Sequence, residues 1–180
     1  RIPNRKLIML DRLQPGYPGN NYGAVYQDFE NDIYEGLTQG LNVSHPIRTL
    51  RVITLPSSLY GSCICKGVDR FSRENNIPVE YLNSAPETIH PGDTFLVLNS
   101  QLDAGLVSLA HVIESAGLQI GKDVFIISYN EFEMNELVLG GLTTVSTDFA
   151  QMGRIAAGMI LNRQMFKMHC PFKMNKRSTF

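Results

Sequence analysis

The stretch Val124-Phe-Ile-Ile-Ser-Tyr-Asn130 decides the fold class, because an apolar run of strand-forming residues leads directly into polar side chains. A run without alternating polar residues is typical of a strand covered on both faces, as strands are in parallel sheets. Six further short runs of strand-forming residues occur at positions 6–10, 24–26, 50–55, 79–82, 95–98 and 142–146. Helical patterns alternate with these runs, which predicts an α/β fold with a parallel sheet.

Four helical patterns separate the predicted strands. In the first, Phe29, Ile33 and Leu37 recur every four residues, as expected of one apolar helix face. The other three patterns cover positions 63–76, 100–117 and 148–162. Segments 14–21 and 84–92 are rich in turn-forming residues, and we predict that both are loops.

The composition excludes several classes of function. Of the 180 residues, 43% are apolar and 18% are charged, as in a soluble globular domain. No apolar run approaches the roughly 20 residues that cross a bilayer, and no signal-peptide pattern stands at the start, so we expect no membrane partner. Because 16 Lys and Arg balance 17 Asp and Glu, we expect no DNA contact through this chain itself.

No constellation for catalysis or metal binding stands out, and we expect neither an enzyme nor a cofactor. The sequence contains no G-x-S-x-G nucleophile motif and no glycine-rich phosphate loop. Cys63 and Cys65 would point to different sides of a helix, and no second pair follows at zinc-site spacing. We interpret them, with Cys170, as packing residues of a reduced cytoplasmic chain.

Polar residues gather where three predicted strands end, and they form the candidate ligand-binding site. In open parallel sheets, ligands bind beyond the carboxyl ends of the strands. Hydroxyls, amides and an aromatic ring at such an edge suit a neutral polyhydroxy ligand. The candidates are Ser58 and Tyr60 after the run at 50–55, Asn99 and Ser100 after 95–98, and Asn130 and Glu131 after 124–128.

Simpler roles exist for several of these residues. Ser58 or Ser100 can cap the helix that follows it, because a serine hydroxyl satisfies the free amides at a helix start. Asn130 can hold a turn. The set as a whole is therefore a stronger indication of a ligand site than any single member.

A series of segments in chain order carries a resemblance to a known family. They are Lys6-Leu-Ile-Met-Leu-Asp-Arg12, Asn21-Tyr-Gly-Ala-Val-Tyr-Gln-Asp28, Tyr60-Gly-Ser-Cys-Ile-Cys-Lys-Gly-Val-Asp-Arg-Phe71, Ile120-Gly-Lys-Asp-Val-Phe-Ile-Ile-Ser-Tyr-Asn130, Gly141-Leu-Thr-Thr-Val-Ser-Thr-Asp-Phe149 with Met152-Gly153 and Ala156-Ala157, and Pro171-Phe172 with Arg177-Ser178. Together they resemble the effector-binding domain of LacI/GalR-type transcription regulators. The resemblance is greatest to the branch in which this domain follows a GntR-type winged helix.

The resemblance implies a type I periplasmic-binding-protein-like fold, with two α/β lobes joined by three crossovers around a small carbohydrate. Residues 1–22 then correspond to the last strand of the first lobe and a crossover, and residues 23–147 to the second lobe. Residues 148–180 correspond to the helix that returns to the first lobe and a final strand. Asp11, Asp28 and Ser146 fall near the crossovers, although Asp28 is at least as well suited to cap the helix beginning at Phe29.

The resemblance also implies a cytoplasmic homodimer that controls transcription by binding DNA through a separate N-terminal domain. Arg1 stands where an initiator methionine is expected, so we expect that this domain and most of the first lobe lie upstream of a cut. Ser58 and Tyr60 fall in a loop that reaches the effector in this family. Asn130 falls where members often carry an aspartate that binds sugar hydroxyls, and Ser100 where many have an aspartate, so both positions are neutral here.

Two other classes of protein remain open. A transport-type periplasmic sugar-binding protein has the same fold, and it would carry a signal peptide upstream in place of a DNA-binding domain. An α/β enzyme such as a sugar-modifying one would need an ionisable pair at the strand ends, where only Glu131 is charged. We therefore rank the enzyme last.

Overall fold

The computed structural model describes residues 3–14, 16–17, 21–41, 47–54, 58, 60–98 and 104–180. The chain divides into two compact units. Unit 1 comprises Arg1–Asp28 and Thr147–Phe172, and unit 2 comprises Phe29–Ser146 and Lys173–Phe180. The chain therefore passes between the units at three places, after residues 28, 146 and 172.

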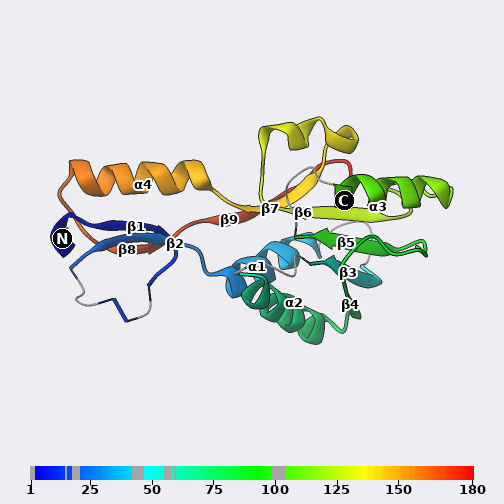
Figure 1. The fold of residues 1–180 in the computed structure, drawn as a ribbon, viewed down its shortest axis with the longest axis horizontal. Helices are drawn as coiled ribbons and strands as arrows, with labels where there is room; N and C mark the ends of the chain where they lie inside the picture. Colours follow the sequence, from blue (N-terminus) through cyan, green and yellow to red (C-terminus); the bar gives the residue numbers. More distant parts are fainter. Residues whose placement is uncertain are drawn as a thin grey trace. The chain divides into compact units, whose positions relative to one another are not determined.

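Unit 2 is built on a six-stranded sheet with the strand order β4-β3-β5-β6-β7-β9 (Figure 1). Neighbouring strands from β4 to β7 all pair in parallel, which confirms the predicted fold class. Because the strands are parallel, the loops that follow them leave from one edge of the sheet. The strands are β3 (Thr49–Ile53), β4 (Val79–Leu82), β5 (Asp93–Val97), β6 (Phe125–Tyr129), β7 (Thr143–Thr147) and β9 (Phe172–Asn175).

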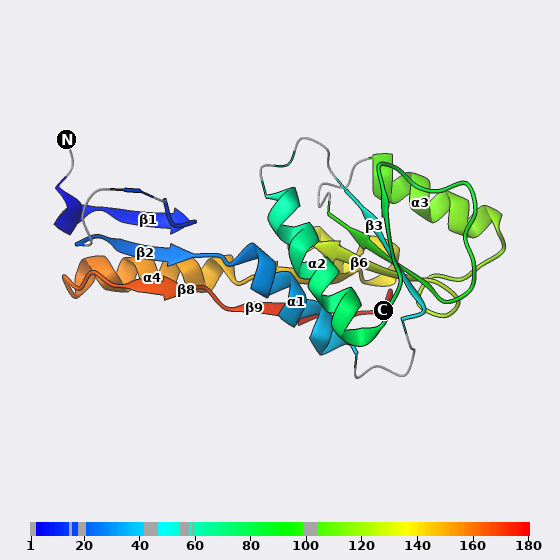
Figure 2. The ribbon, with the colours of Figure 1, turned by 90° about the horizontal axis from the view of Figure 1, so that it is seen from below.

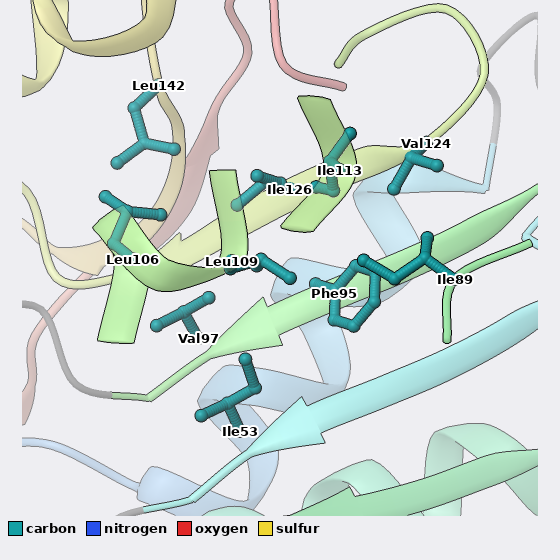
Figure 3. Close-up of a cluster of buried hydrophobic side chains, with 10 residues drawn as sticks. All are labelled: Ile53, Ile89, Phe95, Val97, Leu106, Leu109, Ile113, Val124, Ile126 and Leu142. Carbon is teal, nitrogen blue, oxygen red and sulfur yellow. The ribbon is translucent and has the colours of Figure 1, made fainter. Parts of the chain in front are cut away.

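Helices cover both faces of this sheet, which explains why its central strands are apolar. Helices α1 (Phe29–Gly40) and α2 (Gly61–Asn75) lie side by side on one face, and α3 (Ala104–Ser115) lies on the other (Figure 1). Every residue of β5 and β6 is buried. Figure 3 shows the core between α3 and the sheet, which includes Ile53, Phe95, Val97, Leu106, Leu109, Ile113 and Ile126.

Unit 1 consists of a three-stranded sheet and one long helix. Strands β1 (Ile8–Asp11), β2 (Gly23–Tyr26) and β8 (Lys167–His169) stand in that order and pair in parallel. Helix α4 (Phe149–Leu161) runs along this sheet (Figure 2). The buried core between them consists of Val25, Met152, Ala156, Met159 and Cys170.

Most predicted elements are confirmed, with small shifts at their ends. The strand expected at 6–10 begins at Ile8, because Asn4–Lys6 form a 3₁₀ turn, η1. Asp148 is the N-cap of α4, as its place before the helical pattern indicates, and its carboxylate accepts from the N–H of Gln151 at 2.7 Å. Strand β8 has no counterpart in the prediction, because its three residues are exposed and no apolar pattern marks them.

The division into units differs from the predicted domain boundaries by more than one residue at two places. Residues 23–28 are predicted to start the second lobe, but β2 pairs with β1 and β8 and belongs to unit 1. Residues 173–180 are predicted to belong with the first lobe, but β9 extends the sheet of unit 2, and the N–H of Ile126 donates to the carbonyl of Thr179 at 2.9 Å. Both differences come from pairings between distant segments, which local sequence patterns do not encode.

Helices α1 and α2 approach each other closely at Gly67. A Cβ atom at this position would lie 2.1 Å from the backbone oxygen of Glu30 and 2.4 Å from Cγ2 of Ile33. The first contact is with helix backbone, so α1 would have to shift to accept any side chain there. Glycine is therefore required for the observed packing of the two helices.

We expect Gly67→Ala to lower the free energy of unfolding by about 2 kcal/mol, because overpacking outweighs the better helix propensity of alanine. Gly153→Ala in α4 is the matched control, since nothing lies within 4 Å of its added Cβ. The control should leave stability unchanged or raise it slightly. Urea unfolding followed by circular dichroism measures both variants, and an equal effect of the two substitutions would contradict the close approach.

Candidate ligand-binding site

Polar and aromatic residues follow β3 and β6 at the carboxyl edge of the sheet of unit 2. Ser58 and Tyr60 follow β3, Asn130 and Glu131 follow β6, and all four are half-buried. Only β5 lies between these strands, so their ends are about 10 Å apart. The predicted contributors from β5, Asn99 and Ser100, lie outside the described residues.

The hydroxyl of Ser58 takes part in the turn that starts α2. Its Oγ accepts from the N–H of Gly61 at 3.1 Å and from the N–H of Tyr60 at 3.3 Å. Gly61 is the first residue of α2, so the serine satisfies an amide that the helix leaves free. The structure thus shows a local role of Ser58 in the turn before α2, although the N-cap itself is Tyr60, and its contact with a ligand stays a prediction.

Tyr60 stacks on Phe29 and joins the starts of two helices. The ring centroids are 4.4 Å apart and the ring planes differ by 15°. Phe29 is the first residue of α1, and Tyr60 directly precedes α2. From the sequence, Phe29 is assigned only to the apolar face of α1, because no local pattern reveals a contact with a residue beyond the next strand.

Asn130 occupies a left-handed turn directly after β6. Its φ angle is +71°, a conformation in which asparagine is enriched among non-glycine residues. Its N–H donates to the carbonyl of Val145 at 2.8 Å, and its carbonyl accepts from Nδ2 of Asn135 at 3.4 Å. The structure therefore shows the turn role of Asn130, and its role as a ligand residue stays a prediction.

Glu131 is held by a dense set of hydrogen bonds within unit 2. Arg177 donates to both carboxylate oxygens, from Nη2 to Oε1 at 2.9 Å and from Nη1 to Oε2 at 3.1 Å. Oε2 also accepts from the hydroxyl of Thr144 and from Nδ2 of Asn175, the latter at 3.1 Å. The backbone N–H of Glu131 donates to Oγ of Ser146 at 3.0 Å.

This set of contacts determines the ionisation of Glu131. Burial alone would raise the pKa of the carboxyl group, but the hydrogen bonds from Arg177, Thr144 and Asn175 and the positive charge of Arg177 outweigh it and lower the pKa. The side chain is only 27% exposed, so water screens the pair incompletely. Glu131 is therefore a paired carboxylate, which sequence reasoning missed because Arg177 lies far along the chain.

Two of the predicted crossover residues, Asp11 and Ser146, belong to separate hydrogen-bonded groups. In unit 1, Nε2 of Gln27 donates to Oδ1 of Asp11 at 2.5 Å, and Oγ1 of Thr147 donates to Oε1 of Gln27 at 2.6 Å. Gln27 and Thr147 are buried and were not predicted to have a role. Ser146 in unit 2 is buried against Glu131. Asp28 and Ser146 border passages between the units, whereas Asp11 ends β1 within unit 1.

No metal site is evident in the described ranges, where no three His, Cys, Asp or Glu residues are grouped to hold an ion. Cys63, Cys65 and Cys170 are free thiols, the first two half-buried and the third buried. Burial, reinforced by the negative charge of Asp69, raises the pKa of the Cys65 thiol and disfavours the thiolate.

Among the parts of the chain that the structure describes, no helix combines the length and the apolar character that crossing a membrane requires.

A parallel sheet covered on both faces, with a chain that passes three times between two α/β units, defines the periplasmic-binding-protein-like fold of type I. Residues 65–168, more than half of the chain, match the periplasmic binding protein-like domain family, and the chain belongs to that family. A search among curated proteins found no significant match.

Solved structures of transcription regulators share this fold. The Escherichia coli transcriptional repressor ascG matches with a TM-score of 0.72 and 12% identity, over 96% of this chain and 68% of that chain. A dimeric Lac repressor with a C-terminal deletion matches with a TM-score of 0.67 and 19% identity, over 96% of this chain and 68% of that chain. The transcriptional regulator CelR in complex with cellobiose matches with a TM-score of 0.67 and 14% identity, over 96% of this chain and 58% of that chain. At these identities the likeness concerns the fold alone.

The lowered pKa of Glu131 leads to a prediction about pH and stability. A carboxylate whose pKa is lowered in the folded state stabilises the fold above about pH 4.3 and loses this effect as the pH falls through its folded pKa. We expect Glu131→Gln to lower the free energy of unfolding by about 2 kcal/mol at neutral pH, and to have little effect in strong acid. Urea unfolding of both proteins across this pH range measures the difference.

Glu74→Gln provides the control for this experiment. The Glu74 carboxylate also accepts from an arginine, Arg70, but its side chain is 48% exposed. We expect a smaller loss of stability, because water screens an exposed pair. A difference between wild type and Glu131→Gln that does not change with pH would contradict the assigned pairing.

Proposed function

We propose that this chain is the ligand-sensing part of a bacterial transcription regulator that binds a small carbohydrate and thereby controls DNA binding. Membership of the periplasmic binding protein-like family and the likeness to transcriptional repressors support the proposal. One of the similar structures is described as a complex with cellobiose. A cytoplasmic homodimer is the form that we propose for the intact regulator.

The neutral character of the sheet edge supports a sugar as ligand. Asn130 offers a donor and an acceptor on one side chain, which suits the hydroxyl groups of a sugar. The half-buried rings of Tyr60 and Phe29 offer an apolar surface near the same edge. The carboxylate beside them, on Glu131, is neutralised by Arg177, so the site has no unpaired charge from that group to favour a cation. This pairing is the observation that most directly favours a neutral ligand.

We propose that unit 2 is the second lobe of the sensor and that unit 1 contributes to the first lobe. The remainder of the first lobe and a DNA-binding domain, of the GntR-type winged-helix class, would precede this chain. Asp28 and Ser146 would act as hinges between the lobes. The ligand can shift the lobes only by the difference in its affinity for their open and closed arrangements.

A transport-type sugar-binding protein is the second candidate, because the matching family is defined by likeness to periplasmic binding proteins. Determining the coding sequence upstream of Arg1 discriminates the two. A DNA-binding domain there supports the regulator, and a signal peptide supports the transport protein.

Ligand binding by the intact protein tests the proposal. We expect one or more of D-glucose, D-galactose, L-arabinose, maltose, cellobiose and glucose 6-phosphate to raise the unfolding temperature, because a ligand that binds the folded state stabilises it. Isothermal titration calorimetry then gives the affinity. Failure of all six sugars to bind would contradict a carbohydrate-sensing role.

Asn130→Ala tests the assigned site. We expect it to weaken binding of the best of these sugars by about tenfold or more, because a hydrogen-bonding side chain is lost. Asn76→Ala is the matched control, since Asn76 also has a left-handed backbone (φ +54°) but lies at the far end of α2. Both substitutions place alanine at a positive φ angle, so equal affinities for the two variants would contradict the placement of the site.

A further inference from the structure

The segment that follows β9 is firmly held by β6 and β7. Oγ1 of Thr179 donates to the carbonyl of Ile126 at 2.8 Å and accepts from the N–H of Thr143 at 2.8 Å. Thr179 is fully buried, and the ring of Phe180 packs edge-on against Phe125 at a centroid distance of 5.9 Å. Residues 177–180 are therefore an integral part of unit 2. The backbone position of Arg177 is fixed as a result.

The Arg177 side chain binds the turn that follows β6. Its guanidinium binds both oxygens of Glu131, and its Nη1 also donates to the carbonyl of Leu142 at 3.0 Å. The arginine side chain is 20% exposed, so the pair is mostly removed from water. A two-pronged contact of this kind fixes the orientation of the carboxylate as well as its position.

Glu131 transmits this constraint to Asn130, its neighbour in the chain. The Glu131 side chain is held by Arg177, and its backbone N–H is held by Ser146. On the other side, the N–H of Asn130 is bound to the carbonyl of Val145. The left-handed turn at Asn130 is thus held by a hydrogen bond at its own N–H and by another at the N–H of the next residue, Glu131.

We propose that Arg177 is a positioning residue for ligand binding, which acts through Glu131 to hold the turn that presents Asn130 to the sugar. This inference rests on the proposed function and adds to it. Asn175, the last residue of β9, donates from Nδ2 to Oε2 of Glu131, which also accepts from Nη1 of Arg177. The strand that carries the third passage between the units is therefore bonded directly to the ligand-presenting turn.

A direct role of Glu131 in sugar binding is the competing explanation. Its Oε2 already accepts from Arg177, Thr144 and Asn175, and its Oε1 accepts from Arg177. A sugar hydroxyl that bound Oε2 would have to compete with three donors, and one that bound Oε1 would share that oxygen with Arg177. The geometry therefore favours a supporting role for Glu131 and leaves the direct contact to Asn130.

Hydrogen exchange of the intact protein without ligand tests the local effect. We expect Arg177→Lys, which keeps the charge but loses the two-pronged contact, to speed exchange of the Asn130 and Glu131 amides about tenfold relative to the Ile127 amide in β6. Arg177→Ala should have a larger effect. The control is Arg70→Lys, which alters an arginine–glutamate pair on the exposed surface of α2 and should leave these amides unchanged.

Sugar binding tests the route through Asn130. With the best-binding sugar of the panel as probe, Arg177→Ala should weaken affinity about tenfold and Arg177→Lys less. Adding Arg177→Ala to Asn130→Ala should cause little further loss, because the two residues act on the same contact. Arg70→Lys should leave the affinity unchanged.

Two results would overturn the proposal. In the first, exchange of the Asn130 and Glu131 amides rises no more than that of Ile127, which indicates a general loss of stability. In the second, the losses of affinity from Arg177→Ala and Asn130→Ala multiply, which indicates independent roles. If no sugar of the panel binds the wild type, the proposed function fails, and the exchange result alone decides whether Arg177 holds the turn.

Discussion

The parallel pairing of β3, β5 and β6 determines where the candidate residues of unit 2 lie. Because the three strands run in the same direction, the residues that follow them emerge at a single edge. Helices bury both faces of the sheet, so the loops at its edges are the exposed parts. Tyr60 and Asn130, far apart in the sequence, both follow strands that end at this edge.

Local sequence patterns were sufficient to predict the fold class and most elements. The apolar spacing of Phe29, Ile33 and Leu37 corresponds to α1, and the unbroken apolar run after Val124 corresponds to β6, because burial imposes both patterns. The pairing of β2 with β1, and of β9 with β7, could not be predicted, since it depends on contacts between segments distant in the chain.

The places of the candidate residues after the strands were predicted more completely than their contacts, and their role in ligand binding stays a prediction. Asn130 and Tyr60 were identified because polar and aromatic residues directly follow strands, a signal that is local. The contact of Tyr60 with Phe29 and the pairing of Glu131 with Arg177 carry no local signal, because each partner lies on a different element. From the sequence Glu131 was the only charged candidate at the strand ends, whereas the structure pairs it with Arg177.

The crystal structure of the intact protein with its best-binding sugar tests this account most directly. The account predicts a sugar hydroxyl within about 3 Å of the Asn130 side-chain amide, with the Glu131 carboxylate still bound to Arg177. A sugar bound away from this edge would contradict it. So would a sugar that binds Glu131 directly after displacing Arg177.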